Sequence, residues 1–408
     1  MENKSSFKKK IAAILASILL MFSKASANTN AIPTLPNDTP VAEKELNIKS
    51  FSSLAKNYKD VGAISEDIIP LDEILSTHIR GEVCDTMVPQ GLAVSKDFIL
   101  MTAYDGIEGY KTELRLHSYN AKYNQELREE QNHEVHNSVI YILDRKTHEI
   151  ITTLELPDLN HVGGIATDDE NVYIAKSSDG EISVISLERI KRAVERARQE
   201  GTKAQRMFYE KKLRCNCDAS FITIREEDGK KQFVIGTWTP LPGNSTLRIF
   251  EMDENQELDQ VQKLSVCSSA NGAKFVKRGD KEYLVVASSI SRNIDSRLYV
   301  YEVEKDEKGK MEFTLRSKFI LPPMLEEIDE IEDENGERKL LIGTEIFSKR
   351  YEIGRQSVYP TGIIVANLDS ILDRETREEE KSKTDKSSQE FIVPSPAKKE
   401  DEEDEIEK

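Results

Sequence analysis

Residues 137–143 read NSVIYIL, a polar turn followed by a run of β-branched and aromatic residues. Such a run after a turn is typical of the start of a β-strand. The phrase recurs as DGEISVI at 179–185, NSTLRIF at 244–250, DSRLYVY at 295–301 and PTGIIVA at 360–366. Self-similarity at a spacing of tens of residues indicates a repeat architecture before any single motif is considered.

Each phrase is preceded by two short apolar runs, which predicts four antiparallel strands per unit once a following run is added. The following runs lie at 149–156, 206–213, 260–266 and 313–321. No such run follows the fifth phrase, so we expect the segment from Leu75 to Glu82 to supply the missing strand and leave no open edge. The sequence predicts an all-β propeller of five four-stranded blades closed by an N-terminal strand, with a six-bladed ring as the alternative.

The two ends of the chain differ from the blades. A basic start, a short apolar run at 11–22 and the small residues at 25–27 are typical of an export signal. An uncleaved membrane anchor is the alternative, which is disfavoured because spanning needs about 20 apolar residues. The expected organisation is a signal peptide at 1–27, a partly ordered spacer at 28–74, the propeller at 75–370 and a charged, disordered tail at 371–408. We therefore expect a secreted or periplasmic protein with no stable membrane insertion after signal cleavage.

The net charge bears on the class of partner, and two insertions interrupt the regular series of strands. The net charge of −17 argues against nucleic acid as a partner, because phosphate binding needs a basic face. Residues 187–199 have apolar residues at helical spacing and are expected to form one helical insertion. A second insertion, 105–136, separates the second and third strands of the first blade and carries three of the six histidines.

Four cysteines occur in the chain, and an exported protein is expected to use them in disulfides. Cys84, Cys217 and Cys267 fall at equivalent points, where an outer strand crosses to the next inner strand. Pairing of Cys267 with Cys215 or Cys217 is the preferred connectivity. A metal half-site at Cys215 and Cys217 is the alternative, although no second pair of cysteines or histidines has a suitable spacing.

The stretch VIYILDRKTHEI at 139–150 resembles the strand–turn–strand signature of YncE-like propellers, which are exported bacterial proteins. The resemblance covers about 77–368 at the level of the fold, and it implies a propeller without implying an activity. The sequence contains no Trp-Asp blade ending, no paired-glycine kelch motif and no Asp box of the sialidase type.

In a propeller, the crossings between blades and the loops between second and third strands share the end of the ring that surrounds the channel mouth. We expect this face to carry the function. The predicted binding residues on it are Gln90, Tyr104, Asp218, Trp238, Arg292, Glu345 and Arg350. The crossings also place Asp85, His161, Asn271 and Glu326 there.

Two functions fit this face. In the first, the protein is not an enzyme and binds a protein or a glycan, with Tyr104 and Trp238 supplying rigid contact area. In the alternative it is a metal-assisted hydrolase, a lactonase or a polysaccharide lyase. His136 or His161 would then act as general base, with Asp105 among the candidate catalytic residues. The candidate metal ligands are Asp218, Asn271 and Glu345, and Ca²⁺ is the cofactor expected of such oxygen ligands.

Overall fold

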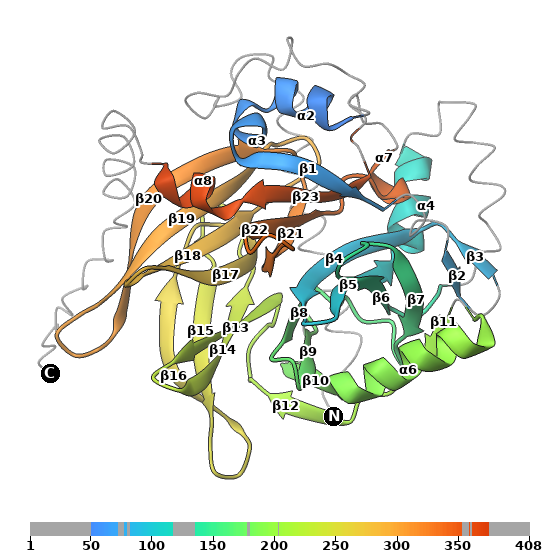
Figure 1. The fold of residues 1–408 in the computed structure, drawn as a ribbon, viewed down its shortest axis with the longest axis horizontal. Helices are drawn as coiled ribbons and strands as arrows, with labels where there is room; N and C mark the ends of the chain where they lie inside the picture. Colours follow the sequence, from blue (N-terminus) through green and yellow to red (C-terminus); the bar gives the residue numbers. More distant parts are fainter. Residues whose placement is uncertain are drawn as a thin grey trace, which may run out of the picture. The chain divides into compact units, whose positions relative to one another are not determined.

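Five sheets stand around a common centre, as Figure 1 shows. The computed structural model describes residues 50–71, 77–79, 82–116, 135–177, 180–202, 204–352, 359 and 361–374, all within one compact unit at Leu46–Lys408. The expected signal peptide, most of the spacer and almost all of the charged tail lie outside the described residues. The five-bladed prediction is confirmed.

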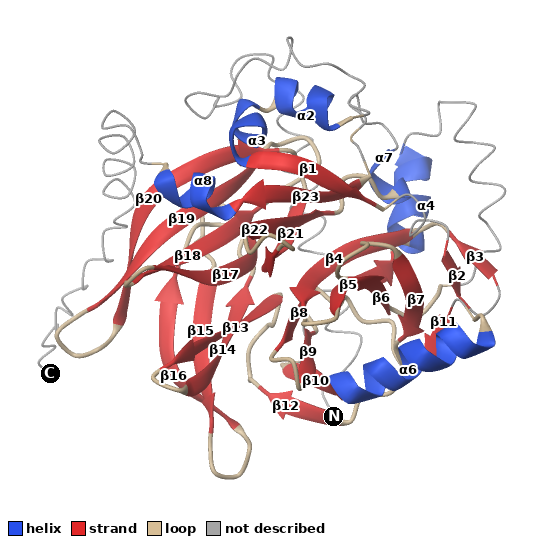
Figure 2. Ribbon diagram, in the orientation of Figure 1, coloured by secondary structure: helices blue, strands red, loops and turns tan. Residues whose placement is uncertain are grey.

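The blades follow the chain in order, and each has four antiparallel strands (Figure 2). Blade one is β4 (Met87–Val94), β5 (Phe98–Asp105), β6 (Val139–Asp144) and β7 (Ile150–Glu155), and blade two is β8 (Gly164–Thr167), β9 (Asn171–Ala175), β10 (Glu181–Ser186) and β12 (Lys211–Arg214). Blade three is β13 (Phe221–Glu227), β14 (Lys230–Thr237), β15 (Thr246–Met252) and β16 (Leu258–Ser265). Blade four is β17 (Ala270–Arg278), β18 (Lys281–Ser288), β19 (Ser296–Lys305) and β20 (Met311–Leu321). The repeated phrase begins the third strand of every blade.

Blade five is closed by an N-terminal strand, but by a different segment from the one expected. It consists of β21 (Leu325–Glu332), β22 (Arg338–Thr344), β23 (Gly362–Asn367) and β1 (Ser65–Pro70), with β1 antiparallel to β23. The expected segment instead forms the hairpin of β2 (Thr77–Ile79) and β3 (Glu82–Cys84). The physical reason is that β1 lies at the edge of its sheet and needs to bury only one face, so two apolar residues are enough to form the fourth strand of blade five. A proline is tolerated at the end of such an edge strand.

The helices lie at the ends and edges of the blades. They are α2 (Phe51–Asn57), α3 (Lys59–Ile64), α4 (Ile107–Leu116), α6 (Leu187–Glu200), α7 (Lys349–Glu352) and α8 (Leu368–Asp373). The predicted helical insertion is therefore confirmed as α6, which buries its apolar face against blades one and two. Among the residues that the structure describes, no helix has both the length and the apolar character needed to cross a bilayer.

A short strand ties blade two to blade one. After α6 the chain forms β11 (Ala204–Arg206), which pairs in parallel with β7 of blade one, before it returns to blade two as β12. Blade one therefore has a fifth, outermost strand that comes from the chain of its neighbour.

The hydrophobic core is divided among the seams between blades. Five clusters of buried side chains each fill the space between two neighbouring blades, for example blades one and two with α6. At the centre the inner strands approach closely at glycines, because a Cβ on Gly164 would lie 2.5 Å from the Cα of Phe221 in the next blade. Packing between blades, and not within one blade, therefore holds the ring together.

Candidate functional site

Bulges in three inner strands place polar side chains at the channel mouth. The register of β4 shifts between Pro89 and Leu92, that of β17 between Ala270 and Gly272, and that of β21 between Leu325 and Ile328. These shifts contain Gln90 in β4, Asn271 in β17 and Glu326 in β21. A bulge turns a side chain out of the regular alternation and is frequent beside functional sites.

The side chains carried by these bulges meet at a pair of carboxyl groups. Glu326 and Glu345 are 8% and 5% exposed and hydrogen-bond to each other. Gln90 donates from Nε2 to Oε2 of Glu345 over 2.7 Å, and Asn271 donates from Nδ2 to Oε1 of Glu326 over 3.2 Å. Tyr351 lies near Glu345 and opposes the rise of its pKa. The network joins blades one, four and five.

The carboxyl pair holds a proton at neutral pH. Burial raises the pKa of Glu345 to about 7, against the opposing effect of the nearby Arg350 and its hydrogen bonds. Burial, followed by the charge of Glu345, raises the pKa of Glu326 well above its ordinary value. Two buried carboxyl groups in contact cannot both ionise without strong repulsion, so the pair carries both a donor and an acceptor.

Aromatic and cationic groups surround the carboxyl pair. The rings of Tyr104 and His161 are 4.6 Å apart, and Arg350 donates from Nη1 to the Tyr104 hydroxyl over 2.5 Å. His161 is exposed, whereas Tyr104 and Arg350 are half-buried. Partial desolvation by neighbouring groups, together with the positive charge of Arg350, lowers the pKa of His161 to about 4. His161 is therefore neutral near pH 7, as a base or a hydrogen-bonding group must be.

The structure joins most of the predicted residues at the mouth, but not all of them. Asp218 is exposed and its backbone carbonyl accepts from Thr237, whereas Trp238, 38% exposed, donates from Nε1 to the Ser289 carbonyl over 3.3 Å. Arg292 lies half-buried in the loop between β18 and β19. Among the contacts of the described residues, none joins Asp218 to the carboxyl pair, so calcium binding by the full predicted set stays a prediction.

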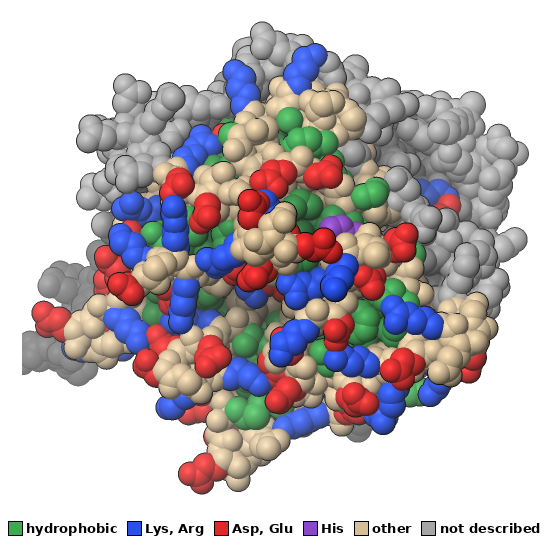
Figure 3. Space-filling view, in the orientation of Figure 1, with side chains coloured by type: hydrophobic (Ala, Val, Ile, Leu, Met, Phe, Trp, Pro, Cys, Tyr) green, Lys and Arg blue, Asp and Glu red, His purple; other side chains and the backbone are tan. Residues whose placement is uncertain are grey.

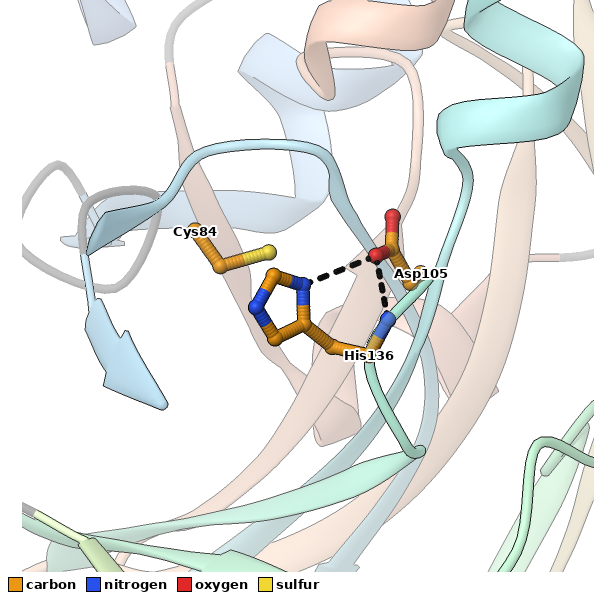
Figure 4. A group of neighbouring side chains, drawn as sticks. All are labelled: Cys84, Asp105 and His136. Atoms are coloured by element: carbon orange, nitrogen blue, oxygen red, sulfur yellow. Dashed lines mark hydrogen bonds and ion pairs between the residues drawn. The ribbon is translucent and has the colours of Figure 1, made fainter. Parts of the chain in front are cut away.

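A second cluster lies beside the mouth, at the base of the insertion in blade one. Figure 4 shows the thiol of Cys84 directed toward the imidazole of His136, which approaches Asp105. Nδ1 of His136 lies 3.1 Å from Oδ2 of Asp105, and the backbone N of His136 donates to the same oxygen over 2.8 Å. Thr86 donates from its hydroxyl to Oδ1 of Asp105 over 2.7 Å, and Ile107 donates its backbone N–H over 3.0 Å. All three clustered side chains are buried.

The predicted disulfides are wrong, because all four cysteines are free. Cys267 is half-buried in the crossing between blades three and four, near Tyr301 and Ser288, and desolvation raises its pKa to about 12. Cys215 and Cys217 contact each other, and Cys84 belongs to the cluster with Asp105. Topologically equivalent crossings in a propeller are separated by the width of a blade, so equivalence does not bring their side chains together.

Sequence reasoning identified Asp105 and His136 but assigned Cys84 to a disulfide. It also placed Glu326 at the mouth without naming it as a binding residue, and it missed Tyr351. Glu326 carried a usable signal, since it enters the inner strand of blade five at the position that Asn271 has in blade four. Cys84 carried none, because its approach to His136 depends on how the long insertion returns to the ring.

A large cavity, about 1110 Å³, lies away from both clusters. Its walls are β1 and the hairpins on the opposite end of blades one and five, including residues 145–150 and 331–334. Its charged side chains have both signs, among them Lys146 and Glu149. Size alone does not make it the better site, since the bulges and the buried carboxyl pair lie at the other end.

The arrangement of the five sheets defines this chain as a five-bladed β-propeller. Its solved structural neighbours include Kuenenia stuttgartiensis hydrazine synthase, with 12% identity, a TM-score of 0.32 and coverage of 83% of this chain and 89% of that one. Myxococcus xanthus glutaminyl cyclase has 12% identity, a TM-score of 0.37 and coverage of 70% and 93%. A Bombyx mori β-fructofuranosidase, solved as a complex with sucrose, has 9% identity, a TM-score of 0.37 and coverage of 68% and 59%.

The chain thus spans 59% of the length of that β-fructofuranosidase chain. No family model matches the sequence, and no curated protein matches it either. The structural neighbours are distant and say nothing about the activity of this chain. These comparisons therefore assign the chain to no family.

Proposed function

We propose that this propeller binds a glycan at its channel mouth. The observation that carries the proposal is the Glu326–Glu345 pair, in which the bulge of β21 carries Glu326 and the residue after β22 is Glu345, with Tyr104 and His161 nearby. A regular strand would not direct these groups to one point, so the bulged backbone supports a role beyond packing.

The chemistry of the mouth suits a ligand with many hydroxyl groups. A carboxyl pair with one proton, the amides of Gln90 and Asn271, and the phenol of Tyr104 both donate and accept hydrogen bonds. A sugar hydroxyl has the same dual character. The face of the Tyr104 ring and the exposed Trp238 on the same end of the ring add flat apolar area for the carbon skeleton of a sugar.

The charge of the site favours a neutral ligand. The proton shared by Glu326 and Glu345 leaves the pair with one negative charge, and Arg350 supplies one positive charge beside it. Outside the mouth, Figure 3 shows Lys and Arg interspersed with Asp and Glu over the visible face, without a large patch of one sign. Nucleic acid, which needs a basic face, fits this surface poorly.

A hydrolase is the second candidate, because a neutral-range carboxyl pair is also a device for acid–base catalysis. The geometry favours binding over glycoside hydrolysis. Hydrolysis of a glycosidic bond uses two carboxyl groups about 5 Å or more apart on either side of the bond, whereas Glu326 and Glu345 touch each other. A dyad that activates water remains an outcome of the test below.

The expected location agrees with this role. The export signal expected at 1–27 and the likeness of 139–150 to YncE-like propellers would both suit an exported bacterial binding protein. Such a protein would meet polysaccharides or surface proteins outside the cytoplasm. A protein that binds the same face is the alternative to a glycan.

The test is a glycan array followed by calorimetry on the mature chain, 28–408. We expect a glycan that binds wild type and loses affinity about tenfold on Tyr104→Ala, the loss of one aromatic contact of about 1.4 kcal/mol. His148→Ala, in the turn between β6 and β7 at the opposite end of the ring, is the matched control and should bind as wild type. Binding that is insensitive to Tyr104 and to Glu345→Gln would refute the site.

Incubation of the bound glycan with wild type, followed by mass spectrometry, separates the two candidates. An intact glycan supports binding alone. Cleavage that Glu345→Gln abolishes would replace the binding proposal by the hydrolase.

A further inference from the structure

We propose that Cys84, Asp105 and His136 form a zinc-binding site at the base of the insertion in blade one. The site is separate from the carboxyl pair, and it does not depend on what the channel mouth binds. The proposed zinc site would account for the presence of a buried cysteine beside Asp105 and His136.

The three side chains have the spacing of ligands to one ion. One ligand atom from each lies within 4.8 Å of the other two. In a tetrahedral zinc site with bonds of about 2.0–2.3 Å, ligand atoms lie about 3.3–3.8 Å apart. Nδ1 of His136 and Oδ2 of Asp105 are already 3.1 Å apart, so only a small movement of the side chains is needed.

The carboxylate is held in place by groups that would not bind the metal. Thr86 and the backbone N of Ile107 both donate to Oδ1 of Asp105, while Oδ2 faces His136. Outer partners of this kind fix the direction of a ligand and strengthen metal binding. Cys84 and Asp105 come from the segments that flank β4, and His136 ends the insertion just before β6, so the fold itself assembles the set.

The ligand types select zinc over calcium. A thiolate and an imidazole are soft or intermediate ligands, which suit Zn²⁺, whereas Ca²⁺ takes oxygen ligands. The thiolate and the carboxylate together would balance the two positive charges of the ion. Three protein ligands leave one tetrahedral position, and water is the ordinary fourth ligand of such a site.

The main competing interpretation is a nucleophilic thiol activated by histidine. Cys84 is 0% exposed, and the contact that the structure gives its sulfur is the Thr86 hydroxyl at 3.6 Å. Reactive cysteines are partly exposed, so that a substrate can reach the sulfur. Burial of all three groups instead suits an ion that is retained.

Zinc here would connect the ends of the 105–136 insertion to the segment that leads into blade one. Because Tyr104 directly precedes Asp105, the ion would also fix the strand that supplies the aromatic part of the channel mouth. The expected consequence is thermal stabilisation of the folded protein by the metal.

The experiment measures bound metals in the full mature chain by mass spectrometry, without added chelator and after refilling with ZnCl₂. We expect one zinc ion per chain in wild type, and its loss in Cys84→Ser, Asp105→Asn and His136→Gln. The matched control is Cys217→Ser, which removes a different cysteine and should retain the ion. EDTA should lower the Tm of wild type, and zinc should restore it.

Cobalt provides a second measurement that does not depend on a variant remaining stable. In the wild-type chain Co²⁺ should give a sulfur-to-metal charge-transfer band, because a thiolate ligand is present only if Cys84 binds the ion. Wild type that takes up no zinc overturns the proposal. Loss of zinc in Cys217→Ser with retention in Cys84→Ser also overturns it, and another metal with the same variant pattern overturns the choice of zinc.

Discussion

Replacement of Glu345 by Gln should change how stability depends on pH. The pKa of Glu345 is raised to about 7 from an ordinary 4.5, chiefly by burial. Between these values the folded chain binds more protons than the unfolded chain, so the free energy of unfolding is highest below about 4.5 and falls as pH rises toward 7. A shift of this size corresponds to a loss of about 3 kcal/mol.

His161 acts in the opposite direction and must be separated from this effect. Its pKa is lowered from 6.5 to about 4, so the unfolded chain binds more protons in that window and stability falls as pH decreases. In wild type the opposite effects of Glu345 and His161 on the pH dependence of the free energy of unfolding partly cancel. Comparison with Glu345→Gln isolates the carboxyl group, because glutamine keeps a neutral side chain that can accept from Gln90 and donate to Glu326.

The assay is urea denaturation from about pH 5 to pH 8, followed by circular dichroism and by the fluorescence of the single Trp238. Relative to wild type, Glu345→Gln should gain about 3 kcal/mol of stability across this range, with most of the gain reached by pH 7. Glu254→Gln, exposed in the turn between β15 and β16, is the matched control and should run parallel to wild type. A constant difference between Glu345→Gln and wild type, or one that grows toward acid, would show that the pair is not protonated as described.

Two further predictions concern packing and a buried charge. Gly164→Ala places a Cβ against the backbone of Phe221 and should cost about 1–3 kcal/mol in the free energy of unfolding, and an unchanged urea midpoint would contradict the close approach of blades two and three. Lys176→Met removes one of two partners of Asp158, whose Oδ2 is 3.0 Å from Nζ of a lysine that is 1% exposed and whose Oδ1 accepts from the Tyr209 hydroxyl. Because Asp158 is partly accessible, the cost should be about 2 kcal/mol, below that of breaking a fully buried pair. It should become smaller in the double variant with Asp158→Leu, in which only the hydrogen bond from the Tyr209 hydroxyl is lost in addition.

The repeated phrase was enough to predict the blades, because a polar turn followed by β-branched residues has the same physical meaning in every copy. The closing strand was misplaced for the opposite reason. Residues 65–70 contain only Ile68 and Ile69 as strongly apolar residues, and their pairing with β23 depends on a partner at the far end of the chain. Local pattern does not contain that information.

The mouth was predictable as a face but not as a set of contacts. Gln90, Tyr104, Glu345 and Arg350 were expected on one end of the ring, and the structure joins them. That Glu326 would share a proton with Glu345 depends on a bulge, which shifts the register by one residue and leaves no clear mark in the alternation. The cysteines were misassigned because a disulfide needs a Cα–Cα distance that only the folded ring determines.

Closure of blade five by β1 also sets the order in which the protein can fold. When β1 leaves the ribosome, its partner β23 is still unmade, and nearly the whole ring must follow before the two can pair. The last blade is therefore the last to be completed, and a chain truncated before Gly362 has all five inner strands but an open seam. The ring can therefore be closed only in a chain that extends through β23, so the pairing of β1 with β23 distinguishes such a chain from any shorter one.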